Sequence, residues 1–483
     1  MAINLSIPLA WTKAGADELN MLQCLQGNIL KGHGRHFTAN LFFRLDPAKT
    51  LRSRRMLRDL ANFHISSAYR QLLDAQRFKE TRQGAGPFVH LALAAKGYQA
   101  LGLASSAPTD PDFRAGMKAP ASLAALHDPA VSDWEPPFQQ EIHGVVLAAE
   151  ETASLLGALA VSLRELVEDG GGTVAFVQHG ASLFNAAGEG IEHFGYVDGR
   201  SQPLLLQEDI DTETAEAGSS RWNPAFPLAT ALVKDPGTTD AVSFGSYFVF
   251  RKLEQAVRAF KTREQAIADR LGLAGPERER AGAMIVGRFE DGTPVTLSRT
   301  ARSAAPPNNF NYTNDPGTRC PLHGHIRKTN PRGSGGAEPE MAERAHLMVR
   351  RGIPFEDVKR AVLPSELPDA GTMAEFLEKV APLLPERGVG LLFMAYNHSI
   401  GEQFRFTQQI WANNTNFPTK PVGAHGLDPV IGKGANRPGE QKLPKAWDDA
   451  TAGTLDTEPF GGFVAMKGGE YFFSPSLTFL LNL

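Results

Sequence analysis

The strongest constraint on the fold is an order of strands and helices that occurs twice along the chain. In the first half, short apolar runs typical of strands alternate with stretches whose apolar residues recur at helical spacing. The predicted order is strand, helix, strand, strand, helix, strand, over residues 38–45, 51–63, 88–94, 142–148, 155–166 and 173–178. Three glycines at 170–172 end the second helix. This order defines the split βαβ, or ferredoxin-like, unit.

The second half repeats this order with larger insertions. The predicted segments are 246–251, 253–260, 345–350, 389–396, 400–411 and either 463–466 or 471–473, with an inserted helical stretch at 373–384. Two copies of one unit predict an α+β architecture in which sheets pack together with helices outside. We expect an N-terminal domain of residues 1–205 and a C-terminal domain of residues 206–483.

Composition excludes several classes of partner. Of the 483 residues, 42% are hydrophobic and 21% are charged, which is typical of a globular domain. The 49 Lys and Arg nearly balance the 53 Asp and Glu, so nucleic acid and anionic membrane surfaces are not expected partners. No apolar run approaches the roughly 18 residues of a membrane span, and no secretory leader is visible. Because two cysteines cannot form a disulfide framework, we expect a cytoplasmic location.

The segment Cys320–Arg332, with the sequence CPLHGHIRKTNPR, concentrates candidate ligands. It has three interpretations. The first is a solvated basic loop, since short motifs match by chance. In the second, His323 and His325 bind zinc, because residues two apart on an extended segment face the same way. In the third, His325 is the single axial ligand of a haem iron.

The haem interpretation also explains the cations that follow His325. Arg327, Lys328 and Arg332 can pair with the two propionates of a haem. The C-x-x-C-H signature for covalent attachment is absent, so the haem would be held noncovalently.

Two other stretches offer groups for peroxide chemistry. Asp198 in the sequence GYVDG is either part of a structural turn or a carboxylate that carries a proton between the two oxygens of peroxide. In the second interpretation, Gly195 and Gly199 let the backbone approach a flat cofactor. Arg350 is either a solvated cation at a strand end or a fixed guanidinium that stabilises developing negative charge.

The apolar strand over residues 389–396 carries two further candidates. Leu391 and Phe393 are core residues by default, and in a haem pocket they would also exclude water from the iron.

These segments together resemble the dye-decolourising peroxidase family. GYVDGRSQP resembles the family's GxxDG signature, CPLHGHIRKTNPR the segment with the proximal histidine, and VRRGIPF the segment with the distal arginine. Residues 26–45 and 390–406 also fit the family, so the resemblance runs through most of the chain in the same order.

The resemblance implies two ferredoxin-like domains of the dimeric α+β barrel type, with haem b in the C-terminal one. It implies that His325 is the axial ligand, Asp198 the proton carrier and Arg350 the distal cation, with Leu391 and Phe393 on the peroxide side. His323 has no ligand role in the family. The family also has a carboxylate that accepts the proximal imidazole N–H, and Glu402 is the candidate here.

The function expected from the sequence is a haem peroxidase that reduces hydrogen peroxide and oxidises bulky aromatic donors such as dyes and phenolics. A homo-oligomer is possible on this interpretation. Two alternatives are a haem-binding or iron-handling protein with incidental peroxidase activity and a haem-free module that binds zinc. The first would share the haem absorption band and differ in its reaction with peroxide, whereas the second would have no such band.

Overall fold

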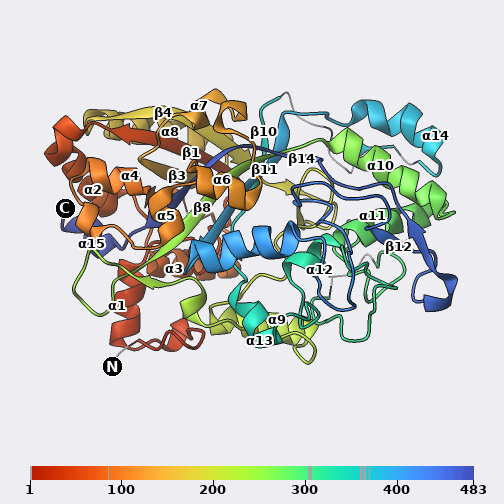
Figure 1. Ribbon diagram of the computed structural model, residues 1–483. Helices are drawn as coiled ribbons and strands as arrows, with labels where there is room; N and C mark the ends of the chain where they lie inside the picture. The colour runs from red at the N-terminus through yellow and green to blue at the C-terminus, as the bar shows by residue number, and fades with distance from the viewer. Residues whose placement is uncertain (1–2, 85, 303–306, 359–361, 363–365, 369) are drawn as a thin grey trace.

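The fold is built on one long antiparallel sheet that combines strands from both halves of the chain (Figure 1). The structure, a computed structural model, describes residues 3–84, 86–302, 307–358, 362, 366–368 and 370–483. The sheet order is β10-β11-β8-β14-β2-β3-β1-β4, and two short strands, β7 and β9, pair with β8 and β11. These strands are β1 Phe37–Leu45, β2 Phe88–Leu93, β3 Gly144–Glu150, β4 Gly172–Ala181, β7 Val233–Lys234, β8 Phe244–Gln255, β9 Val349–Arg350, β10 Ile353–Glu356, β11 Val389–Asn397 and β14 Val464–Ser474.

Four further strands form two small ribbons outside this sheet. They are β5 Leu183–Phe184 with β6 Gly190–Ile191, and β12 Lys442–Pro444 with β13 Thr454–Asp456.

Each half of the chain supplies one group of four neighbouring strands. In the first group, β1 is paired on one side with β3 and on the other with β4, and β2 pairs with β3. In the second group, β8 lies between β11 and β14. Most strand residues are buried, so the strands appear in the sequence as apolar runs. This duplicated arrangement confirms the predicted α+β fold of the dimeric α+β barrel type.

The two groups meet twice, once in the middle of the strand path and once where its two end strands come together. On one side, β14 pairs with β2 at Phe473 and Leu93. On the other, β4 lies directly against β10, because a Cβ added to Gly180 would be 2.7 Å from Ile353 Cγ2 and 3.1 Å from the Pro354 carbonyl oxygen. The path therefore closes on itself in the manner of a barrel.

Gly180 is expected to be required for this closure. Gly180→Ala should lower the free energy of unfolding by about 1–3 kcal/mol, because the new methyl group would overlap β10. Gly157 is the matched control, since it lies in a helix and an added Cβ would meet nothing within 4 Å. Gly157→Ala should raise stability by roughly 0.5–1 kcal/mol. Denaturant unfolding measures the free energy of unfolding of both variants. Equal changes in Gly180→Ala and Gly157→Ala would contradict the contact between β4 and β10.

The helices enclose the sheet and surround the site region. Figure 1 shows α2 and α8 beside the N-terminal strands, and α10 and α11 toward the other end of the molecule, with α12 nearer its middle. The α-helices are α1 Ala16–Cys24, α2 Thr50–Phe63, α3 Ala68–Thr81, α4 Ala95–Ala100, α5 Pro111–Ala115, α6 Pro120–Leu126, α7 Pro136–Gln139, α8 Ala153–Asp169, α9 Gln207–Ala217, α10 Val257–Arg270, α11 Glu279–Val286, α12 His325–Thr329, α13 Glu340–Ala345, α14 Met373–Glu375 and α15 Leu477–Leu481. Segments Phe376–Val380, Ile400–Arg405 and Thr407–Ala412 are π-helical.

One predicted strand was wrong in its extent. Residues 345–350 were expected to form a strand, but α13 runs to Ala345 and only Val349 and Arg350 pair with β11, as β9. The chain then turns into β10. The helix expected from 253 begins at Val257, because β8 continues through Gln255. The domain division at residues 205 and 206 stays a prediction.

Candidate active site

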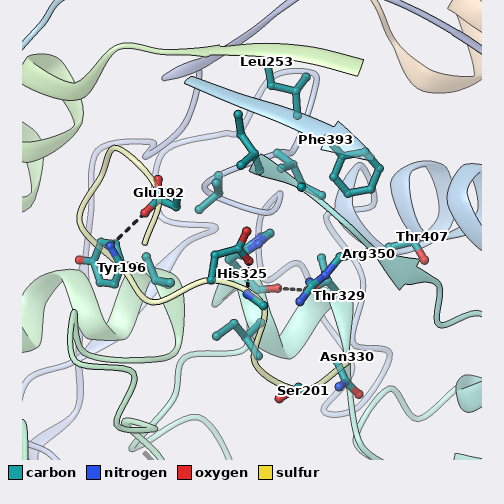
Figure 2. A pocket seen from close by; sticks show the side chains of 18 of the residues that line it. Glu192, Tyr196, Ser201, Leu253, His325, Thr329, Asn330, Arg350, Phe393 and Thr407 are labelled. Atoms are coloured by element: carbon teal, nitrogen blue, oxygen red, sulfur yellow. Dashed lines mark hydrogen bonds between the residues drawn. The ribbon is translucent and has the colours of Figure 1, made fainter. Parts of the chain in front are cut away.

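A cavity in the C-terminal half collects the candidate residues from separate parts of the sequence (Figure 2). The loop 192–203 forms one wall, and residues of β8, β9 and β11 form another. Helix α12, the π-helical segments Ile400–Arg405 and Thr407–Ala412, and residues 430–433 complete it. Asp198, Gly199, His325, Arg350, Leu391 and Phe393 all line this cavity.

His325 is fixed by a buried carboxylate that the sequence analysis did not identify. It is the first residue of α12, and its Nδ1 lies 2.8 and 3.0 Å from the two carboxylate oxygens of Asp428. The Asp428 side chain is fully buried, and one of its oxygens also accepts the N–H groups of Val430 and Ile431 at 2.8 and 2.9 Å. Burial alone would raise the pKa of Asp428, but His325 and the two N–H groups together hold that pKa below its usual value.

This geometry sets the tautomer of His325. A carboxylate only accepts hydrogen bonds, so the imidazole proton belongs on Nδ1 and the lone pair on Nε2. The ring lines the cavity and is 21% exposed. An imidazole held in this way is suited to donate Nε2 to a metal, and the ionised partner strengthens that donation.

Glu402 was wrong as the proximal carboxylate. Its side chain is 71% exposed and lies 3.1 Å from His398 Nε2, whereas Asp428 holds the His325 ring. Asp428 is 103 residues from His325 in sequence, so no local spacing connects the two.

Asp428→Asn is expected to weaken the site by about 10- to 100-fold, in haem affinity or in peroxidase rate. A neutral amide can no longer give the imidazole N–H a charged acceptor, so the ring donates its Nε2 lone pair more weakly. Haem titration followed by absorption measures the affinity. Glu402→Gln is the control and should change neither quantity, and an equal loss in both variants would contradict the assignment.

The distal candidates lie on the loop 192–203 and on β9. Gly199 has φ of +84°, and its N–H donates to the Asp198 carboxylate at 2.7 Å, so a tight glycine turn orients this acid. Arg350 pairs with Ala395 of β11 in the sheet register, and its guanidinium donates to the Arg200 carbonyl at 3.2 Å. This single bond leaves guanidinium donors available at the cavity wall.

Gly195 has a different place from the one predicted. Its φ of +97° requires glycine, but it is not among the residues that line the cavity, and an added Cβ would lie 3.4 Å from the Glu290 carboxylate. Its role is therefore to shape the turn and not to approach a cofactor.

Arg327 and Arg332 were wrong as cavity-facing cations. Arg327 points away from the cavity and donates to the carbonyls of Cys320 and Asp315, both at 2.8 Å. Arg332 is buried between the rings of Trp222 and Phe310, and it reaches the cavity wall only through Ser201 Oγ at 2.7 Å.

Other cations face the cavity instead. Arg288 donates to Ser201 Oγ at 3.0 Å, and burial lowers its pKa to about 10. Lys433 donates to the Val464 carbonyl at 2.6 Å, and burial lowers its pKa to about 8. Both line the cavity and are candidates for holding anionic groups of a ligand. The sequence analysis missed them because neither lies in a distinctive motif.

Glu192 is a further acid that the sequence analysis missed. It lines the cavity, and its carboxylate accepts the N–H of Phe194 at 2.8 Å. It also accepts the N–H of Tyr196 at 3.0 Å (Figure 2). Burial raises the pKa of Glu192 to about 7, although the hydrogen bonds from Gln255 and the two N–H groups oppose this shift.

One wall of the cavity is formed by apolar side chains. Leu391 and Phe393, two residues apart on one face of β11, both line the cavity. Leu253 of β8 lies beside Phe393 in the lining (Figure 2). His323, by contrast, is buried outside the lining and its Nε2 has no hydrogen-bond partner. Among the residues that the structure describes, no cluster of three or more His, Cys, Asp or Glu could hold a metal ion. This set of residues, with one imidazole, apolar walls and separate cations, fits a haem better than a zinc ion.

Comparison with known proteins agrees with this geometry. Residues 24–179 match the family described as the DyP dimeric alpha+beta barrel domain. The chain is 46% identical over the full length of both proteins to the multifunctional dye peroxidase DyP2 of an Amycolatopsis species. It is 32% identical to peroxidase 2 of Mycetinis scorodonius, covering 98% of this chain and 89% of that protein.

Solved structures show the same likeness over nearly the whole chain. DyP2 from Amycolatopsis aligns with a TM-score of 0.91 over 100% of both chains. A DyP-type peroxidase from Anabaena aligns with a TM-score of 0.85 at 36% identity, covering 96% of this chain and 94% of that one. Within the described part of the chain, no helix is both long and apolar enough to cross a membrane. The full-length identity to DyP2 shows that this chain belongs to the dye-decolourising peroxidases, haem enzymes that use hydrogen peroxide.

Proposed function

We propose that the cavity binds haem b noncovalently, with His325 Nε2 as the axial ligand of the iron. The hydrogen bond between His325 Nδ1 and Asp428 carries this proposal, because it leaves Nε2 as the only lone pair of the ring. The apolar side chains of Leu391 and Phe393 suit the faces of a porphyrin. Arg288 and Lys433 are the cations that would pair with its propionates.

The residues of the loop 192–203 and β9 would then act on peroxide. When bound, the haem supplies the redox chemistry that cleaves the O–O bond. Asp198 would take the proton from the oxygen that stays and return it to the oxygen that leaves, so that water departs. Arg350 cannot give up its proton under these conditions, so its role would be to stabilise the negative charge on the departing oxygen.

The reducing substrates proposed are bulky aromatic donors such as dyes and phenolics, each giving one electron at a time. A related dye-decolourising peroxidase, 28% identical with a TM-score of 0.71, was solved in complex with 2,6-dimethoxyphenol. A cytoplasmic location and a homo-oligomer stay predictions.

Absorption spectroscopy of the purified protein tests this function. We expect a haem band, and a rapid change of that band into a defined new spectrum after one equivalent of hydrogen peroxide. Sluggish bleaching would instead indicate a haem carrier, and the absence of any haem band would contradict the cofactor.

Arg350→Leu should slow the reaction with peroxide by about 100- to 1000-fold, the effect of removing one preorganised donor from a developing oxyanion. Haem binding should be retained, because Arg350 is not a proposed ligand. The control is Arg405→Leu, which removes a partly exposed cation paired with Asp112 outside the cavity lining and should cost little. Stopped-flow mixing measures both rates, and equal rates in the two variants would exclude Arg350 from the reaction.

A further inference from the structure

A buried tyrosine and a buried histidine form a pair between the two halves of the sheet. Tyr396 lies on β11 and His90 on β2, and both side chains are fully buried. The Tyr396 hydroxyl lies 3.1 Å from His90 Nε2, and the two rings meet edge to face with centroids 5.6 Å apart. This pair lies outside the cavity lining and has no part in the proposed peroxide chemistry.

The neighbours of His90 determine which atom carries its proton. Nδ1 is 3.0 Å from the Gly27 carbonyl oxygen, which can only accept, so the proton lies on Nδ1. Burial lowers the pKa of His90 to about 3, so the ring is neutral near pH 7. Nε2 therefore carries the lone pair of the ring, and two hydroxyls share it, that of Ser474 at 2.8 Å and that of Tyr396 at 3.1 Å.

The Tyr396 oxygen is also held from its other side. Asn28 Nδ2 donates to this oxygen at 3.4 Å, while Asn28 Oδ1 accepts the His33 N–H, which fixes the orientation of the amide. The phenolic proton therefore points to His90. Tyr396 has both a base for its proton and a donor for the oxygen that remains.

The strand β11 connects this pair to the cavity wall. Leu391 and Phe393 face the cavity, and Ala395 is the register partner of Arg350. Tyr396 is the next residue along the strand, and its side chain points to the opposite face of the sheet. There the centroid of its ring lies 5.0 Å from the centroid of the Phe248 ring. Tyr396 is therefore a buried residue of the same strand that forms the cavity wall, on the face turned away from the cavity.

Most other buried tyrosines lack such a base. The hydroxyls of Tyr98 and Tyr471 have no hydrogen-bond partner, and that of Tyr247 accepts the N–H of Asp110. Tyr196, whose hydroxyl donates to Glu264 at 2.9 Å, is the competing candidate. Its ring lies under the Lys261 ammonium at 4.7 Å, and a cation so placed opposes removal of an electron from that ring.

We propose that Tyr396 is a redox-active residue whose oxidation is coupled to proton transfer to His90. One electron leaves Tyr396 for the peroxide-oxidised haem site, and the phenolic proton moves to His90 Nε2. The products are a neutral tyrosyl radical and an imidazolium held by the Gly27 carbonyl. An electron from an external donor and return of the proton restore the pair. The inference rests on the proposed haem peroxidase function.

The base is what makes this oxidation possible in a buried place. A phenol that loses an electron and keeps its proton becomes a cation, which is costly in the absence of water. An oxidised phenol is a much stronger acid than imidazolium, so even a weakly basic imidazole takes the proton. Tyr98 and Tyr471 have no acceptor for it.

Electron paramagnetic resonance of the full-length, haem-loaded protein tests this assignment. The protein is mixed with one equivalent of hydrogen peroxide without reducing substrate and frozen rapidly. We expect a radical signal that narrows when the protein contains ring-deuterated tyrosine. Tyr396→Phe should abolish the signal, and His90→Gln, which retains the phenol and removes the imidazole, should also abolish it.

Tyr471→Phe is the matched control, because this hydroxyl is equally buried but has no partner. It should leave the radical signal unchanged. A signal that persists in Tyr396→Phe, or is lost in Tyr196→Phe instead, would overturn the inference. The haem absorption band is followed in the same samples. If the radical results contradict the assignment but the haem band of Tyr396→Phe and Tyr196→Phe still changes with peroxide, only this inference fails. If wild type shows no response, the proposed function itself fails.

Discussion

Asp198→Asn is expected to slow the reaction with hydrogen peroxide by about 100- to 10,000-fold, the range found for loss of a positioned acid–base group. An amide cannot take the peroxide proton and return it to the departing oxygen. The position of the haem band should not change, because Asp198 is not a proposed ligand. The Asp198 carboxylate accepts the Gly199 N–H, and an amide oxygen can accept the same bond.

Stopped-flow absorption over a range of peroxide concentrations measures this rate. Asp211→Asn is the control, since Asp211 is an exposed acid on α9 outside the cavity lining. It should react as fast as wild type. A fast reaction in Asp198→Asn would remove Asp198 from the mechanism and leave Arg350 and the haem to account for the rate.

His325→Ala is expected to eliminate stable haem binding and with it the peroxidase activity. The variant removes the only imidazole lining the cavity among the described residues, and the buried Asp428 carboxylate then loses this partner and keeps only the N–H groups of Val430 and Ile431. Because a buried carboxylate without its partner is costly, the variant should also unfold at a lower denaturant concentration. Absorption during haem titration measures the first effect and denaturant unfolding the second.

His323→Asn separates this assignment from its neighbour in sequence. His323 is buried outside the cavity lining, so the variant should retain the haem band even if its stability falls. Loss of the band in His323→Asn with retention in His325→Ala would reverse the ligand assignment. Retention in both would place the ligand elsewhere in the chain.

The strand and helix order was largely accessible from the sequence, because burial on a sheet leaves a simple pattern. β2, β8 and β11 appear as apolar runs at the positions predicted, since most of their residues are buried on both faces of the sheet. The region 345–350 was less accessible. Its apolar residues are shared between the end of a short helix and a two-residue strand, and such a boundary has no periodicity of its own.

The residues of the candidate site were also only partly predictable from the sequence. Asp198, His325 and Arg350 stand in compact motifs whose neighbours left other roles open, and the resemblance to the peroxidase family selected them. The structure brings all three to one cavity. Arg327 lies two residues after His325 and was therefore expected beside the same ligand. Because α12 starts at His325, position 327 projects to a different side of the helix and is buried against Asp315.

The sequence by itself determined the fold class and the motif residues, because local periodicity and glycine turns depend only on near neighbours. Only the tertiary structure decided the partner of His325, since Asp428 is 103 residues away and meets it through packing of the loop after residue 425. The cavity-facing cations Arg288 and Lys433 were decided in the same way. A charged side chain looks the same in sequence whether it faces solvent, a carbonyl or a cavity, and burial alone distinguishes these cases.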